Sequence, residues 1–324
     1  MKKKYIYILQ MKTETIGVNE RSQIGICFYG LTKTLKHNYE SIKLNVIDHF
    51  KKDYNIKIYL HTYNLKEITN TRNGENKAPI SPSEWMMLNP DKYIIENQDD
   101  FDKLQNWESI FLGKKDTFEN NYVSFKNIIR QSNSLEKVTN LWENDSIKFK
   151  ALIYVRPDTE IPFSINLDDI ANIKDNELYL NTRISPYPND RFAYGGPKAM
   201  SVYGHRLKST INEMKKIFYG GEYYLDVVLK KNKDIVVKHT GVCTIRRRPP
   251  TNKISEYDAE CLRVALKKEN FESQNDRRFA SKDTASPYLK KSNVVDFKII
   301  LILIILIILI IVFLIFAKLA LRAK

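Results

Sequence analysis

The sequence is poor in the residues that define several common protein classes. Its 324 residues include only 3 cysteines, 11 glycines and 11 prolines. So few cysteines exclude a framework of several disulfides, and none stands in a Cys-x-x-Cys pair, which argues against a zinc site built on thiolates. The low glycine and proline content excludes a collagen-like or low-complexity chain. Hydrophobic residues at 43% and charged residues at 28% indicate a globular protein with a full core.

Acidic residues are in the minority, because 38 Asp and Glu face 52 Lys and Arg, for a formal net charge of +14. Residues 246–324 hold a large share of this excess, with 16 basic and 8 acidic side chains. The sequence has no RNP1-like string, no zinc-finger spacing and no basic heptad helix, so we expect no nucleic acid as a partner. A basic stem beside a membrane explains the charge better, since anionic head groups attract such segments.

The N-terminus lacks the pattern of a signal peptide. The apolar stretch at residues 5–9 is too short, and no small-residue cleavage site follows it. A much longer apolar run, IILILIILIILIIVFLIFA, occupies residues 299–317. At about 1.5 Å per residue it would span roughly 28 Å, close to the hydrocarbon thickness of a bilayer. This run predicts a single transmembrane helix, with a lipid bilayer as a partner.

The run is followed by a short basic tail, residues 318–324. Basic residues flank both ends of the run, so charge alone leaves the orientation open. The short tail favours a C-terminal anchor with the bulk of the chain in the cytosol. The expected organisation is a catalytic domain over residues 1–248, a polar basic stem over 249–298, the membrane helix and the tail.

Strands and helices are predicted to alternate, which is typical of an α/β fold with a mainly parallel sheet. Apolar, β-rich runs predict buried strands over 23–30, 56–63 and 149–155. Between the first two, Tyr39, Ile42, Val46 and Phe50 recur at helical spacing. Residues from about 64 to 116 are polar and contain three prolines, so we expect a long irregular insertion there.

The rest of the domain is predicted to continue this alternation. The sequence predicts helices over 118–142, 197–207 and 222–231, and strands over 177–182 and 234–239. Asn133 and Glu136 stand at capping-box spacing, which predicts a new helix start inside the first of these helices.

Polar groups gather where the predicted strands end, and in an open parallel sheet ligands bind beyond the carboxyl ends of the strands. We therefore expect a nucleotide site built from Tyr29, Gly30, Leu31, Thr32, His61, Arg156 and Asp158. Asp158 and Glu160 are two residues apart and point the same way in extended backbone, which suits a divalent cation such as Mn²⁺ or Mg²⁺. The alternative is that Asp158 caps the turn after its strand or pairs with Arg156.

A second cluster, NDRFAYGG, occupies residues 189–196 before a predicted helix. Asp190 could accept a proton from an acceptor hydroxyl, with Arg191 beside it. Gly195 and Gly196 would permit close approach of the backbone to a ligand. The alternative is an ion pair between Asp190 and Arg191 at a loop.

Three blocks of the chain resemble glycosyltransferase-like proteins of large DNA viruses, algae and protists. The first is IGICFYGLTKTLKHNYESIKLNVID followed by IYLHTY, the second is ALIYVRPDTEIP, and the third is NDRFAYGGPKAMSVYGHRL. They lie discontinuously between about Gln23 and Thr240, in the same order as in that family.

The resemblance implies a GT-A-like fold, which is one Rossmann-like domain that binds a nucleotide-sugar. It implies that Asp158 takes the place of the acid that contacts metal and diphosphate, and that Asp190 and Arg191 lie near the acceptor or the transferred sugar. The usual Asp-x-Asp is replaced here by Arg-Pro-Asp-Thr-Glu, so the need for a metal stays open. Lys33 stands where family members often have Arg.

The function expected from these features is that of a membrane-anchored glycosyltransferase. It would move a sugar from a nucleotide-sugar donor to a hydroxyl of a glycan, protein or lipid acceptor. The alternative is a catalytically inactive, membrane-anchored binding protein with a glycosyltransferase-like domain.

Overall fold

The computed structural model describes residues 21–181 and 187–246, together with Asp258 and Arg263. The predicted transmembrane helix and tail lie outside the described residues, and so does the predicted stem except for Asp258 and Arg263. In the part of the chain that the structure describes, no helix is both long and apolar enough to cross a membrane.

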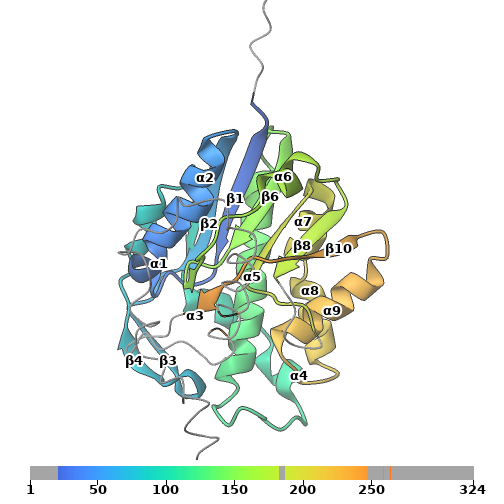
Figure 1. Cartoon of the computed structure of the whole chain (residues 1–324). Helices are drawn as coiled ribbons and strands as arrows, with labels where there is room; N and C mark the ends of the chain where they lie inside the picture. Colours follow the sequence, from blue (N-terminus) through green and yellow to red (C-terminus); the bar gives the residue numbers. More distant parts are fainter. Residues whose placement is uncertain (1–20, 182–186, 247–257, 259–262, 264–324) are drawn as a thin grey trace, which may run out of the picture. The chain divides into compact units, whose positions relative to one another are not determined.

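A seven-stranded sheet in the order β10-β8-β9-β6-β1-β2-β5 forms the centre of the fold (Figure 1). Its strands are β1 (Gln23–Tyr29), β2 (Asn55–Tyr63), β5 (Lys92–Glu96), β6 (Phe149–Val155), β8 (Glu177–Asn181), β9 (Phe192–Gly195) and β10 (Val236–Thr240). Of these strands, β9 runs antiparallel to both of its neighbours, and the other pairs are parallel. The prediction of an α/β fold with a mainly parallel sheet is confirmed.

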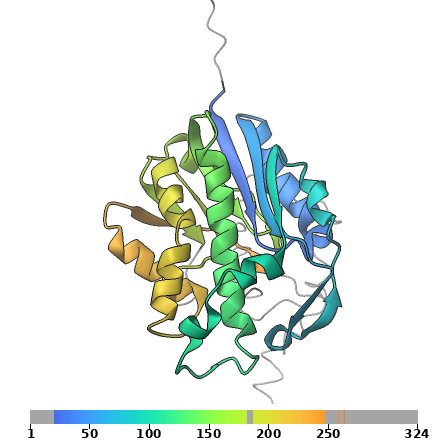
Figure 2. The same cartoon turned by 180° about the vertical axis from the view of Figure 1, so that it is seen from behind.

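Side chains alternate along β1 and so build a hydrophobic core on each face of the sheet. Ile24, Ile26 and Phe28 pack on one face with α1 (Leu35–Ile42). Cys27 and Tyr29 pack on the other face with α5 (Val123–Glu143). Figures 1 and 2 show these two helices on opposite sides of the strands. The sheet is therefore the middle layer of three.

Helices complete both outer layers. On the first face, α1 runs on through a π-helical turn, η1 (Lys43–Ile47), into α2 (Asp48–Lys51). The predicted apolar face is confirmed, because Ile42, Val46 and Phe50 are fully buried. On the second face, α7 (Pro197–Gly204) and α8 (Leu207–Met214) pack against α5, and α9 (Gly221–Lys231) packs against α7 and α8. Contrary to the capping prediction, α5 continues through Asn133 without a break.

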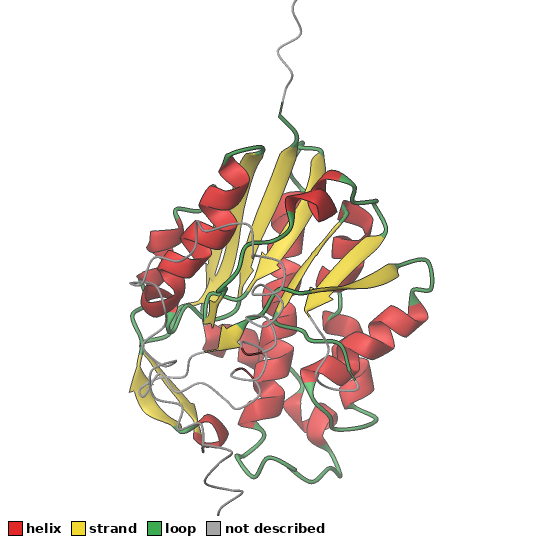
Figure 3. Cartoon of the chain, in the orientation of Figure 1, coloured by secondary structure: helices red, strands yellow, loops and turns green. Residues whose placement is uncertain are grey.

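The segment from about 64 to 116 is not irregular, so that prediction was wrong. It contains β5, which extends the main sheet by pairing in parallel with β2. It also forms a separate antiparallel hairpin of β3 (Glu67–Asn70) and β4 (Glu75–Pro79), which stands apart from the main sheet (Figure 3). Its helical turns are η2 (Thr71–Asn73), η3 (Glu84–Leu88), α3 (Gln98–Lys103) and α4 (Trp107–Phe111).

Short elements lie around the ends of β6 and β8. They are β7 (Thr159–Glu160), α6 (Leu167–Ala171) and β11 (Ile245–Arg246). β11 pairs antiparallel with β7, which places Arg246 opposite Thr159. This pairing brings Ile245 and Arg246 back to the residues that follow β6.

Gly195 and Gly196 end β9 against the protein's own backbone. A methyl group at Gly195 would lie 2.6 Å from the carbonyl oxygen of Glu177, and one at Gly196 would lie 2.2 Å from that of Lys174. The glycines therefore allow β9 to pack closely beside β8 and the turn before it. The prediction that they allow close approach of a ligand is not supported, since neither lines the pocket described below.

Candidate active site

A pocket of about 400 Å³ opens at the carboxyl edge of the parallel strands. Pockets that hold small molecules are typically about 300–1,000 Å³. Gly30 and Leu31 line it after β1, and Arg156 and Asp158 line it after β6. Asp190 lines it as well, because the antiparallel β9 begins where β6 ends, with Phe192 opposite Val155. The fold thus brings four of the predicted strand-end residues together with Asp190 and Arg191 of the second cluster.

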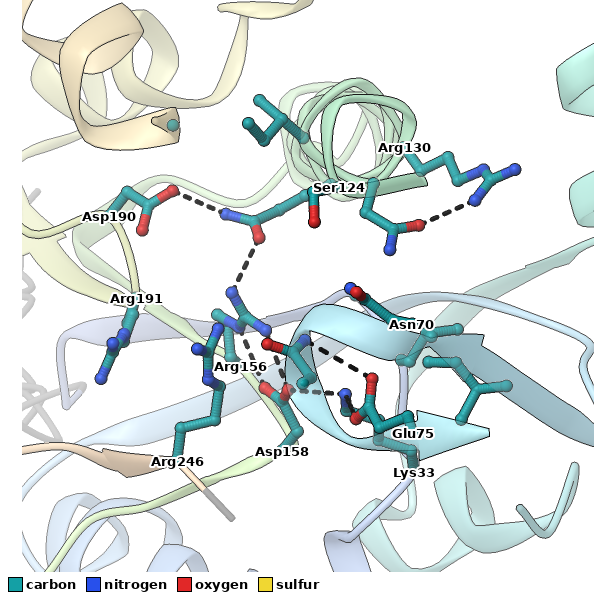
Figure 4. A pocket seen from close by; sticks show the side chains of 18 of the residues that line it. Lys33, Asn70, Glu75, Ser124, Arg130, Arg156, Asp158, Asp190, Arg191 and Arg246 are labelled. Carbon is teal, nitrogen blue, oxygen red and sulfur yellow. Dashed lines mark hydrogen bonds and ion pairs between the residues drawn. The ribbon is translucent and has the colours of Figure 1, made fainter. Parts of the chain in front are cut away.

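The remaining walls come from elements without a recognisable motif. The β3–β4 hairpin contributes Asn70 and Glu75, and the start of α9 contributes Gly220, Gly221 and Glu222. Helix α5 contributes Ser124, Asn127, Ile128, Arg130 and Gln131. Figure 4 shows side chains from these elements around the same space. Sequence reasoning missed them because neither their composition nor their spacing marks them.

Arg156 and Asp158 form a two-pronged ion pair at the floor of the pocket (Figure 4). Nε of Arg156 donates to Oδ1 of Asp158 at 2.9 Å, and Nη2 donates to Oδ2 at 2.8 Å. Nζ of Lys33 lies 4.0 Å from the same Oδ2. The alternative interpretation of Asp158 as the partner of Arg156 is confirmed.

The charge of the Asp158 carboxylate is fixed by its neighbours. Asp158 is 2% exposed, and burial alone would raise the pKa of its carboxyl. The positive charges of Arg156, Lys33 and Arg246 outweigh that effect and hold the pKa far below its ordinary value. Asp158 therefore stays ionised at the floor of the pocket.

Gln131 joins this pair to the second cluster. Nη1 of Arg156 donates to Oε1 of Gln131 at 2.7 Å. Nε2 of Gln131 in turn donates to Oδ2 of Asp190 at 2.9 Å. A continuous series of side-chain hydrogen bonds therefore connects Asp158 to Asp190 through Arg156 and Gln131. This network fixes the positions of the two motif regions relative to each other.

Three buried side chains outside the pocket lining, those of Tyr29, Tyr203 and Arg206, contact Asp190. The hydroxyls of Tyr29 and Tyr203 donate to its carbonyl oxygen at 2.8 and 3.1 Å. The guanidinium of Arg206 lies 4.4 Å from the centre of the Tyr203 ring and 3.9 Å from Oδ2 of Asp190. Arg206 is only 2% exposed, so its charge acts on Asp190 with little screening. Tyr29 thus supports the site and does not line it.

A second carboxylate lies beside Asp190 at the start of α9. The negative charge of Asp190, together with burial, raises the pKa of the Glu222 carboxyl. The approach of α9 is close, because a methyl group at Gly221 would lie 2.7 Å from Oδ2 of Asp190. The pocket therefore carries a pair of interacting acids, Asp190 and Glu222.

His61 and Thr32 lie outside the pocket lining. His61 is fully buried beneath α5, with Nδ1 2.8 Å from Oγ of Ser134 and Nε2 3.2 Å from Glu96. Burial lowers the pKa of His61. The same Ser134 hydroxyl accepts from the Gly30 amide at 2.7 Å, so His61 supports the loop after β1 indirectly. Thr32 is also buried, and its carbonyl accepts from the amide of Leu35 at the start of α1.

Arg191 lines the pocket and forms an ion pair with Asp258. Its backbone amide also donates to Oδ1 of Asn189 at 3.0 Å. The alternative interpretation of an ion pair between Arg191 and the neighbouring Asp190 is therefore wrong, because a distant acid takes that role.

The side chains around Asp158 do not fit a divalent cation. Both of its oxygens already accept from Arg156, and Lys33 adds a second positive charge. Glu160 lies in β7 opposite Ile245 and does not line the pocket. Within residues 21–181 and 187–246, no group of three or more His, Cys, Asp or Glu side chains could hold a metal ion.

The lining is rich in positive charge. Among the described residues that line the pocket, six are basic and four are acidic. The basic ones are Lys33, Arg72, Arg130, Arg156, Arg191 and Arg246, and the acidic ones are Glu75, Asp158, Asp190 and Glu222. Four of the basic groups are paired with acids, namely Lys33 with Glu75, Arg130 with Asp102, Arg156 with Asp158 and Arg191 with Asp258. The lining itself keeps a small excess of basic over acidic side chains, which favours an anionic ligand.

No protein-family model matches the chain, and no curated protein matches it. Among solved structures, one similar fold is that of the galactosyltransferase LgtC, determined in complex with donor and acceptor sugar analogs. The two sequences are 11% identical, and the match covers 67% of this chain and 73% of the other at a TM-score of 0.37. So distant a likeness does not bear on function.

Proposed function

We propose that this protein is a membrane-anchored glycosyltransferase that uses a nucleotide-sugar donor and a hydroxyl acceptor. The observation that carries the proposal is the connection of Arg156 and Asp190 through Gln131, within one basic pocket at the carboxyl edge of the sheet. Ligands of open α/β sheets bind at that edge. The resemblance of the three sequence blocks supports the same function.

The donor side of the pocket lies by Lys33 and Arg156. Gly30 has a φ of +92°, which glycine adopts readily and which turns the chain sharply after β1. This turn carries Leu31 into the lining, where it can contact the nucleoside. The basic groups next to it attract the phosphates, because charge-assisted hydrogen bonds from Arg and Lys suit phosphate oxygens.

The acceptor side lies by Asp190 and Glu222. In the transfer, the bond between the anomeric carbon and the diphosphate oxygen breaks, and its electron pair leaves with the diphosphate. The acceptor oxygen bonds to the anomeric carbon, and its proton passes to Asp190. A carboxylate positioned in this way acts as a general base. The hydrogen bond from Gln131 aligns its Oδ2.

The membrane anchor in the proposal is the apolar run at residues 299–317. Its length matches a bilayer core, and it carries no charged side chain. The basic residues upstream would hold the catalytic domain close to anionic lipid head groups.

The experiment that tests the function has two stages, both on the full chain in detergent. First, a panel of nucleoside diphosphates and nucleotide-sugars is screened by thermal unfolding, because a ligand that binds only the native state raises the midpoint. Second, transfer from the stabilising donor to glycan, protein and lipid acceptors is measured for the wild type and for Asp190→Asn. We expect one donor to raise the midpoint and Asp190→Asn to lose transfer while it still binds that donor.

Asp226→Asn is the matched control, because Asp226 lies on α9 and pairs with Lys230 without lining the pocket. It should retain transfer. Absence of a midpoint shift with every donor would contradict the proposal and favour the inactive binding protein. Full transfer by Asp190→Asn would remove Asp190 from the chemistry.

A further inference from the structure

The arrangement around Asp158 has a consequence for how the donor's diphosphate is held, and this inference rests on the proposed function. A metal-dependent site needs carboxylate oxygens that are free to bind the cation. Both oxygens of Asp158 are instead taken by the guanidinium of Arg156, at 2.9 and 2.8 Å. A cation entering there would have to displace a buried ion pair and approach Lys33, whose Nζ is 4.0 Å from Oδ2.

Three basic side chains meet at this point from distant parts of the sequence. Lys33 follows β1, Arg156 follows β6, and Arg246 ends β11, and all three line the pocket. The pairing of Arg246 with Thr159 places it beside Asp158, whose pKa its charge helps to lower. Figure 4 shows Arg156, Arg246 and Lys33 around Asp158. Glu75 pairs with Lys33 and Asp158 pairs with Arg156, so three cations face two acids at this point. This positive excess can attract a diphosphate when no metal neutralises it.

The guanidinium of Arg156 keeps N–H groups that can donate hydrogen bonds to a phosphate. A guanidinium carries five N–H groups. Three of them are used, two toward Asp158 and one toward Gln131. The side chain is 15% exposed and lines the pocket, so a phosphate oxygen can reach it.

We propose that Lys33, Arg156 and Arg246 bind the donor's diphosphate directly and that sugar transfer needs no divalent cation. When the sugar leaves, these cations stabilise the charge that the electron pair brings to the diphosphate oxygen. Asp158 is then a positioning residue, because it holds Arg156 in place and does not touch the donor.

The test is calorimetric titration of the full chain with the nucleoside diphosphate that the panel identifies, in EDTA and in Mn²⁺. We expect affinities within about twofold of each other, which is a small difference in free energy. Binding that appears only with Mn²⁺ would overturn the inference while leaving the proposed function intact. Binding in neither condition would overturn both, so the two failures are distinguishable.

Substitutions separate the roles of the charged groups. Arg246→Gln should weaken binding in EDTA by about tenfold or more, as expected for a charge-assisted hydrogen bond. Arg72→Gln is the control, since Arg72 also lines the pocket but lies 3.8 Å over the Phe118 ring on the hairpin side. It should weaken binding much less. Equal losses in the two variants would contradict a localised diphosphate site.

Asp158→Asn distinguishes a positioning residue from a metal ligand. Without a metal, the Asp158 carboxylate repels the diphosphate, so removal of this charge should leave the KM for the donor unchanged or lower. The kcat should fall, because Arg156 loses the residue that holds it in place. If Asp158 were a metal ligand, Asp158→Asn would instead raise the KM for the donor, and added Mn²⁺ would partly reverse that rise. If the variant does not fold, the comparison of EDTA with Mn²⁺ in the wild type and in Arg246→Gln decides the same question.

Discussion

Nη1 of Arg156 and Oε1 of Gln131 lie 2.7 Å apart, and this hydrogen bond joins the end of β6 to helix α5. The Gln131 side chain also donates a hydrogen bond to Oδ2 of Asp190. We therefore expect Gln131→Met to misalign both groups while the pocket remains. Small misplacements in active sites can cost about 100-fold in rate. The predicted result is a kcat for transfer lower by about one to two orders of magnitude, with donor affinity changed much less.

The control for this prediction is Gln105→Met, because Gln105 is also partly buried, but its side-chain amide donates to the carbonyl of Phe101 and it does not line the pocket. Its kcat should match that of the wild type. A Gln131→Met variant with normal kcat would mean that the connection has no role in the reaction.

Gly196→Ala should destabilise the fold strongly. The added methyl group would lie 2.2 Å from the Lys174 carbonyl oxygen and 2.4 Å from Cα of Asp175, and these are backbone atoms that cannot rotate away. Overpacking of this kind typically costs about 1–3 kcal/mol, occasionally more. Chemical denaturation of the two proteins measures the difference.

Gly113→Ala gives the comparison for that measurement. Gly113 has a φ of +68°, but a methyl group there would meet no atom within 4 Å. Its cost should be limited to backbone strain, about 1 kcal/mol. Equal costs at the two positions would show that β9 does not pack against the turn before β8 as described.

His61 and His205 should affect acid stability in opposite directions. Burial lowers the pKa of His61, so below the ordinary value of 6.5 the unfolded chain binds a proton that the folded chain does not. That difference reduces stability as the pH falls. His205 lies 2.7 Å from Glu143, which raises the pKa of His205, so it adds stability at low pH that is lost as the pH rises.

The measurement is the unfolding midpoint between about pH 7.5 and about pH 5.5, the range in which histidines titrate. The midpoint of His61→Gln should fall less steeply on acidification than that of the wild type. The midpoint of His205→Gln should fall more steeply. Parallel curves for the three proteins would contradict the burial of His61 or the ion pair of His205.

The apolar run should hold the protein in membranes. Replacing Ile307 and Ile308 with lysine places two charges at the centre of the run, each at a cost of about 2.5–3.5 kcal/mol. We expect the double variant to be released by alkaline carbonate, whereas the wild type and the control Leu321→Lys stay in the membrane pellet. Release of the wild type would refute the anchor.

The strands that carry the site were predictable because they are buried on both faces and therefore read as apolar runs. This holds for β1, β2 and β6. β5 was missed because it is a short edge strand, with Lys92 and Tyr93 exposed. β9 was missed because its four residues end in glycine and lie in a polar stretch that resembles a loop.

The site was only partly predictable, since strand ends are visible in a sequence and tertiary partners are not. Asp158, Arg156 and Asp190, which the sequence singled out at or near strand ends, do line one pocket. Gln131 was missed because it lies within an ordinary helical pattern and contacts them only through the fold. His61 was misplaced because side chains alternate along a strand, and it shares with Tyr59 the face that packs under α5.

The most direct test of the account is a crystal structure of the protein with the stabilising nucleotide-sugar bound. We expect the diphosphate within hydrogen-bond distance of Arg156 and Lys33, and the sugar directed toward Asp190. A donor bound outside the pocket, or a diphosphate held away from both basic groups, would contradict the proposed function of this site.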